Sequence, residues 1–151
     1  MKKLFLTFLL LGIWVNSYSQ NNDFIRINNE LVKTYLDEYI YESTSRGFNI
    51  GNDLLEKLDY ILVMPPETKV CDLGETNFKT KIIMLSDAVN IDRLVLKVVL
   101  YRELTHTLGA PYDKGSVIMD RKRDKYFSYT AFDDPEIMNI EFSNLMDSIE
   151  K

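Results

Sequence analysis

One apolar stretch in the second half of the chain constrains the fold more than any other feature of the sequence. Asn90 is a suitable helix N-cap, Asp92 places a negative charge at the positive end of the helix dipole, and Gly109 is a typical C-terminal stop. Between these signals the apolar residues nearly encircle a helix axis. They are Ile91, Leu94, Val95, Leu96, Val98, Val99, Leu100, Leu104 and Leu108. Because a helix that is apolar on all sides has to be buried, the sequence predicts a central helix over about residues 90–108.

Two further helices are predicted, one on each side of this stretch. Apolar residues at spacings of three and four predict an amphipathic helix from Asp23 to about Ser45. The last helix begins at Asp134-Pro135-Glu136, which supplies an N-cap, a proline at the first helical position and an acid in the first turn.

The segment between the first two helices predicts strands and turns. Short apolar runs at residues 60–64 and 81–85 are bounded by breakers, which is typical of buried strands. Residues 51–53 predict a turn, and the polar segment 67–80 predicts a loop or an irregular sheet edge. Since strands and helices are not strictly alternating, the sequence predicts one α+β domain with a small mixed sheet packed with helices.

The N-terminal residues have the layout of a secretory signal peptide. Lys2 and Lys3 precede the apolar run Leu4–Val15, and small residues follow it. An uncleaved anchor and a buried core helix are the other interpretations, although the run is shorter than a spanning helix. We expect a signal peptide at residues 1–19, a domain at residues 20–151, and export to the periplasm or the extracellular space without further membrane attachment.

The charge and the cysteine content exclude several classes of protein. The net charge is −5, and loss of the two lysines of the signal peptide takes it to −7. This acidity disfavours nucleic acids and anionic membrane surfaces as partners. Cys71 is the only cysteine, so an internal disulfide is impossible. A lone cysteine is usually a small buried apolar residue.

The end of the predicted central helix carries residues in the spacing of a zinc peptidase. In such enzymes two histidines four residues apart bind one zinc ion, and the glutamate after the first histidine is the general base. Here Glu103 is at the position of the general base, His106 at that of the second ligand and Gly109 at the turn. Met119 follows in a segment that matches a methionine turn.

On these residues the chain resembles the metzincin clan, and within it the small matrixin-like zinc metallopeptidases that bacteria export. The resemblance implies a metzincin-like zincin domain with a central active-site helix. It also implies zinc as cofactor, Glu103 as catalytic residue, and a peptide or protein as substrate or partner.

Two residues depart from the pattern at the ligand positions. Arg102 replaces the first ligand histidine and Tyr112 replaces the third. Arginine has no lone pair to offer a metal. His106, Tyr112 and the neighbouring Asp113 together give two or three mixed ligands, whereas catalytic zinc needs three protein ligands and structural zinc four.

The first interpretation is therefore an exported metallopeptidase homologue with an impaired or lost zinc site and a binding or scaffold role. In this interpretation the guanidinium of Arg102 takes over the structural role of zinc by pairing with Glu103, Asp113 or another carboxylate. An active zinc peptidase with unusual ligands is the second interpretation, and an unrelated secreted interaction domain is the third. The sequence leaves the oligomeric state open.

Overall fold

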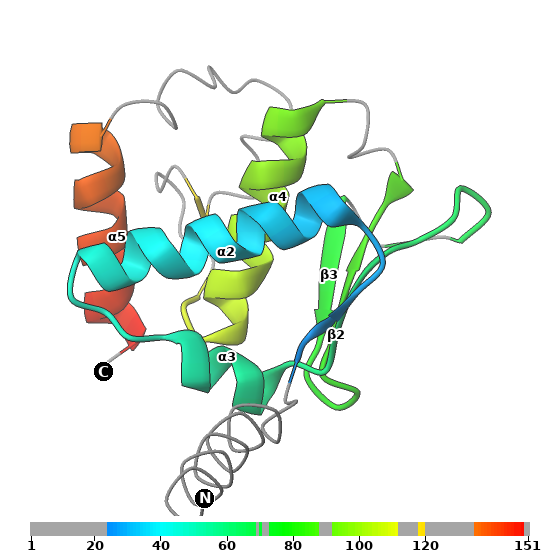
Figure 1. The fold of residues 1–151 in the computed structure, drawn as a ribbon, viewed down its shortest axis with the longest axis horizontal. Helices are drawn as coiled ribbons and strands as arrows, with labels where there is room; N and C mark the ends of the chain where they lie inside the picture. The colour runs from blue at the N-terminus through cyan, green and yellow to red at the C-terminus, as the bar shows by residue number, and fades with distance from the viewer. Residues whose placement is uncertain are drawn as a thin grey trace, which may run out of the picture.

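The structure is a computed structural model that describes residues 24–68, 70, 73–87, 92–111, 118–119 and 135–149. The elements within these residues are, in order, β1 (Arg26–Ile27), α2 (Glu30–Ser45), α3 (Gly51–Lys57), β2 (Tyr60–Val63), β3 (Gly74–Asn77), β4 (Ile82–Leu85), α4 (Arg93–Thr107) and α5 (Pro135–Ile149). They form an α+β fold with a mixed sheet (Figure 1). The predicted signal peptide lies outside the described residues.

The sheet has the strand order β1-β2-β4-β3. β1, β2 and β4 are parallel, with Ile61 opposite Ile83, whereas β3 runs antiparallel to β4, with Thr76 opposite Ile83. Along β2 and β4 the fully buried side chains are Ile61, Ile83 and Leu85. β3 is an edge strand of this sheet, and it is the strand that lies along α4 (Figure 1).

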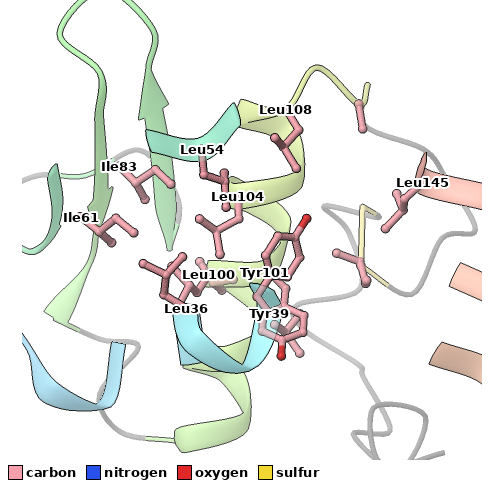
Figure 2. Packing of buried hydrophobic residues seen from close by; sticks show 14 of the residues in the cluster. Leu36, Tyr39, Leu54, Ile61, Ile83, Leu100, Tyr101, Leu104, Leu108 and Leu145 are labelled. Carbon is pink, nitrogen blue, oxygen red and sulfur yellow. The ribbon is translucent and has the colours of Figure 1, made fainter. Parts of the chain in front are cut away.

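Helix α4 occupies the centre of the molecule, as predicted from its apolar circumference. It lies between the sheet and α5 in Figure 1, with α2 packed across it. Figure 2 shows Leu100 and Leu104 of α4 among core side chains from α2, α3 and the sheet. On the α2 side, the rings of Tyr39 and Tyr101 meet edge to face with centroids 4.9 Å apart. Aromatic and aliphatic packing around α4 therefore forms the main hydrophobic core.

Most of the predicted elements are confirmed. The two apolar runs form β2 and β4, and the last helix begins at Pro135. The central helix ends at Thr107, with Leu108 as C-cap and Gly109 beyond it at φ 112°. Its predicted N-cap is wrong, because Asp92 accepts a hydrogen bond from the backbone N–H of Leu94 and the helix begins at Arg93. Asn90 lies outside the described residues.

The N-terminal helix begins later than predicted. Residues 26–27 form β1, and α2 begins at Glu30, with the side chain of Asn29 accepting hydrogen bonds from two backbone N–H groups of the first turn. The side chain of Asn28 donates to the carbonyl of Val63 and accepts from its N–H. Asn28 therefore ends the strand and Asn29 caps the helix. The helical spacing of the apolar residues did not indicate this boundary.

Between residues 51 and 80 one other prediction is wrong and one is confirmed in part. The predicted turn at residues 51–53 is the first turn of α3, in which Asp53 lies at the positive end of the helix and Leu54 is buried. The segment 67–80, predicted to be a loop or an irregular sheet edge, contains the edge strand β3. β3 has the sequence Gly-Glu-Thr-Asn, and its strand conformation is imposed by pairing with β4 and packing on α4 instead of by its own propensity.

Candidate functional site

The candidate site lies where β3 runs alongside α4. Gly74 packs so closely on the helix that an added Cβ would lie 2.7 Å from Cγ1 of Val99. Two residues along the strand, the hydroxyl of Thr76 bonds the carboxyl group of Glu103. After another two residues, the ring of Phe78 contacts that of His106. β3 and the first residue of the turn after it therefore follow the helix over two turns, and their alternate residues meet Val99, Glu103 and His106.

Glu103, the predicted general base, is held inside this junction. Only 2% of the residue is exposed. Oγ1 of Thr76 lies 2.6 Å from Oε2 of Glu103, a distance typical of a hydroxyl that donates to a carboxylate. The carbonyl of Glu103 also accepts a 2.8 Å hydrogen bond from the hydroxyl of Thr107. The carboxyl group is thus oriented toward the edge strand.

Arg102, at the position of the first ligand, is buried to the same degree, with 3% of the residue exposed. Its Nε donates a 3.2 Å hydrogen bond to the carbonyl of Ile118. Ile118 and Met119 are fully buried and belong to the core. Within the described residues no buried side-chain nitrogen or oxygen lacks a hydrogen-bond partner. The guanidinium therefore ties α4 to the turn that contains Met119.

His106 lies one helical turn beyond Arg102 and is partly exposed. Its Nδ1 is 3.1 Å from the carbonyl oxygen of Ala110. Because a carbonyl accepts only, Nδ1 carries the proton in this hydrogen bond, and in the neutral ring the lone pair is then on Nε2. Gly109 permits this geometry, since its φ of 112° turns the chain back toward the helix end.

The structure describes five of the seven predicted site residues, and it directs the side chains of Arg102 and Glu103 to different partners. Arg102 and Glu103 are neighbours on one turn of α4, His106 is on the next turn, Gly109 follows the C-cap of that helix, and Met119 is in the turn bonded by Arg102. Tyr112 and Asp113 lie outside the described residues, as does Cys71.

Sequence reasoning missed the contribution of β3 to this site. Gly74, Thr76 and Phe78 fall in the segment predicted as a loop or an irregular sheet edge, and three of the four strand residues are poor strand formers. The only local signal is the two-residue alternation of these three positions, which is too short to predict a strand by itself.

β3 is the last strand of the sheet among the described residues, and the register shows which of its backbone groups pair with β4. The N–H of Ser86 donates to the carbonyl of Leu73 at 2.9 Å, so these opposite residues form a hydrogen-bonded pair. Such pairs alternate along an antiparallel ladder. Glu75 and Asn77 therefore pair with β4, whereas Gly74 and Thr76 direct their N–H and C=O groups away from it. No other strand within the described residues lies beyond β3.

The described side chains do not fit a zinc ion. Arg102 places a permanent cation without a lone pair at the first-ligand position. Across the described ranges, no group of three histidine, cysteine, aspartate or glutamate side chains is close enough to hold a metal ion.

No protein-family model, curated protein or solved structure matches the chain. None of the helices within the described part of the chain is long and apolar enough to cross a membrane.

Proposed function

We propose that this protein is an exported, matrixin-like metallopeptidase homologue that has lost the zinc chemistry and retains the substrate cleft as a binding surface for extended peptide segments. The observation that carries this proposal is the environment of Arg102. A buried guanidinium bonded to the carbonyl of Ile118 stands where the resemblance requires a histidine ligand.

The arrangement around Arg102 supports a structural substitution. In the zinc metallopeptidases that the chain resembles, zinc joins the active-site helix to the residues after it, and the methionine turn is the floor of the zinc site. Here a cation on α4 bonds the backbone beside Met119 directly. Arginine is suited to this position because its donors have a fixed fork geometry and its charge is permanent. We infer that the guanidinium holds the helix and the turn together without a metal.

The peptide-binding part of the proposal rests on the edge of β3. Extended peptides bind exposed sheet edges by adding a strand, with main-chain hydrogen bonds supplying affinity. Thr76 is partly exposed and directs its N–H and C=O groups away from β4, along a strand that is held on α4 by the contact of Thr76 with Glu103. A segment bound there lies next to the residues that correspond to the catalytic positions.

Metal analysis tests the loss of zinc chemistry. Purified wild-type protein, dialysed against zinc and then against buffer, is expected to retain clearly less than one zinc per chain. The Arg102→His variant restores the missing donor and is expected to retain more zinc than the wild type. One tightly bound zinc in the wild-type protein would overturn this part of the proposal and favour an active peptidase with unusual ligands.

Two substitutions at one position test peptide binding at the edge. The probe is a short fluorescein-labelled peptide of alternating threonine and valine with lysine at each end, followed by fluorescence polarisation. Thr76→Val removes the hydroxyl but keeps the outward N–H, whereas Thr76→Pro removes both, and proline is tolerated where the N–H faces away from the sheet. We expect binding to the wild type and to Thr76→Val, and its loss in Thr76→Pro. Absence of saturable binding, or equal binding to both variants, contradicts an edge-strand site.

A further inference from the structure

The edge strand β3 carries a partly exposed carboxylate on the face of the sheet opposite α4. Side chains of a strand alternate between its two faces, and those of Gly74 and Thr76 are directed to α4. Glu75 and Asn77 are therefore directed to the other face, with Glu75 opposite Met84 of β4. Among the described residues the carboxylate of Glu75 has no ion-pair partner. A negative charge thus lies beside the backbone groups that Thr76 directs away from β4.

We propose that Glu75 determines the specificity of this edge and that it selects an extended segment with a basic side chain, lysine or arginine, beside its carboxylate. This inference rests on the peptide-binding function proposed above and names the class of partner. The partner segment carries the basic side chain on the face of the added strand that is directed away from α4.

The register of β3 fixes where an added strand brings its side chains closest to the protein. In an antiparallel ladder hydrogen-bonded pairs alternate with non-hydrogen-bonded pairs, in which opposite side chains are closer. Because Thr76 directs its N–H and C=O groups outward, the residue opposite Thr76 forms a hydrogen-bonded pair with it. The residue opposite Glu75 is then in a non-hydrogen-bonded pair, with Cβ atoms about 4.5–5.5 Å apart. A lysine or arginine at that place reaches the carboxylate of Glu75.

The other groups on this face of β3 do not compete with Glu75 for the partner. The side chain of Asn77 accepts hydrogen bonds from two backbone N–H groups of the following turn and is engaged as its cap. Opposite Glu75 and Asn77 on β4 are Met84 and Ile82, which carry no charge. Glu75 is the only charged residue of the two paired strands. The sign of the charge that this edge presents is therefore set by one residue.

The charge of the whole protein acts in the same direction as Glu75, and the two effects differ in their position dependence. The net charge of −5 attracts a basic segment as a whole. A cross-strand pair acts on one side chain of the segment, since opposite charges directly across a ladder are stabilising and like charges are destabilising. An acidic side chain opposite Glu75 is thus rejected as well as a basic one selected.

Three versions of the labelled peptide test this inference. Serine replaces the terminal lysines, and the peptides differ only at one central threonine position, which is changed to lysine, glutamine or glutamate. For the wild type we expect the lysine peptide to bind about two- to fivefold tighter than the glutamine peptide, and the glutamate peptide to bind more weakly by a similar factor. Fluorescence polarisation measures the affinities. An increase in salt from about 0.05 to 0.5 M should reduce both differences.

Variants of Glu75 identify the residue responsible. Glu75→Lys is expected to reverse the order of the lysine and glutamate peptides, because the edge then carries a positive charge. Glu75→Gln keeps the size of the side chain and should bring the three peptides to within about twofold of one another. If Glu75→Lys does not fold, judged by circular dichroism, Glu75→Gln serves alone.

Asp147→Lys is the matched control for the change in net charge. Asp147 is exposed on α5, and α4 lies between that helix and the sheet (Figure 1). The substitution alters the net charge as much as Glu75→Lys does, at a place remote from β3. This variant is expected to keep the order of the three peptides that the wild type shows.

The outcomes separate this inference from the function on which it rests. Equal binding of the three peptides to the wild type, lost in Thr76→Pro, overturns the role of Glu75 and leaves the edge-strand function standing. A full preference for lysine in Glu75→Lys or Glu75→Gln likewise overturns it. So does an equal loss of the preference in Asp147→Lys, because the net charge then explains it. If none of the peptides binds the wild type, both proposals are wrong.

Discussion

The hydroxyl of Thr76 on the edge strand β3 donates a 2.6 Å hydrogen bond to the carboxyl group of Glu103 on the central helix α4. This bond joins the edge of the sheet to the residue predicted at the general-base position. Since Glu103 is buried, its carboxyl group depends on the protein for hydrogen bonds. The same contact therefore stabilises the fold and orients the candidate site.

Removal of the hydroxyl of Thr76 should destabilise the protein strongly, although the change in the side chain is small. Thr76→Val is expected to lower the free energy of unfolding by about 1.5–3 kcal/mol, the range for hydrogen bonds to charged groups. Urea denaturation followed by circular dichroism measures this change. A double-mutant cycle with Glu103→Gln should give a coupling of about 0.5–3 kcal/mol. Thr80→Val, at an exposed position in the following turn, is the control and should change stability by less than about 0.5 kcal/mol. Zero coupling in the cycle contradicts the proposed role of this bond.

Gly74 should tolerate no side chain, for a steric reason. A Cβ at this position would lie 2.7 Å from Cγ1 of Val99 and 3.1 Å from Cγ of Glu103. Gly74→Ala is expected to destabilise the protein by about 1–3 kcal/mol, as overpacking does, measured by thermal and urea unfolding. The double variant with Val99→Ala should be less destabilised than the sum of the two single variants.

Gly51 offers a matched control for this prediction. Its added Cβ would meet only Cγ2 of Ile40, at an ordinary 3.9 Å, and the residue is helical. Gly51→Ala is therefore expected to be neutral or to stabilise by up to about 1 kcal/mol. If the two alanine variants behave alike, the close approach of β3 to α4 does not control stability.

Arg102 should contribute to stability in the absence of any metal. Arg102→Met removes the donor to the carbonyl of Ile118, so a buried acceptor loses this partner, and we expect a loss of at least about 1–3 kcal/mol. The methyl resonance of Met119 should shift or broaden in the same variant, since the turn loses its contact with α4. Arg93→Met, at an exposed position at the start of α4, is the control and should stay within about 0.5 kcal/mol of the wild type. An unchanged stability of Arg102→Met would exclude a structural role for the guanidinium.

The tyrosines of the core should make the protein sensitive to alkaline pH. Burial raises the pKa of Tyr39 well above its usual range, with a hydrogen bond to Thr105 acting in the opposite direction. Burial also raises the pKa of Tyr101, together with the negative charge of Glu42 and the hydrogen bond that Tyr101 donates to it.

The sign of the effect follows from proton binding in the two states. Below about pH 10 both tyrosines are neutral in the folded and the unfolded chain. Above it the unfolded chain loses protons that the folded chain retains, so the free energy of unfolding falls by up to about 1.4 kcal/mol per pH unit for each tyrosine. Urea titrations between about pH 8 and 11 measure this slope. Tyr39→Phe should reduce this slope by the contribution of one proton. An unchanged slope in that variant contradicts the raised pKa of Tyr39.

The sequence contained strong signals for the long and apolar elements. The residues of α4 are apolar around the whole helix, so burial in the centre is the only stable solution for them. β2 and β4 are short apolar runs bounded by breakers, and α5 follows Pro135. For these elements local propensity and tertiary packing agree, which is why their positions were predicted to within a few residues.

The elements that build the candidate site from the sheet side had weak local signals. β3 is polar and contains a glycine, so its strand conformation depends on pairing with β4. The start of α2 was placed too early because Phe24 and Ile27 continue the helical spacing, whereas Asn28 and Asn29 act through side-chain hydrogen bonds to specific backbone groups.

The sequence by itself determined the α+β composition, the burial of the central helix and the identities at positions 102, 103 and 106. Only the tertiary structure decided what these side chains contact. The carboxyl group of Glu103 is directed to Thr76, the guanidinium of Arg102 to the carbonyl of Ile118, and the ring of His106 to Phe78. Each partner is between 16 and 28 residues away along the chain, and hydrogen bonds and ring contacts at such separations depend on packing, which no local pattern of residues encodes.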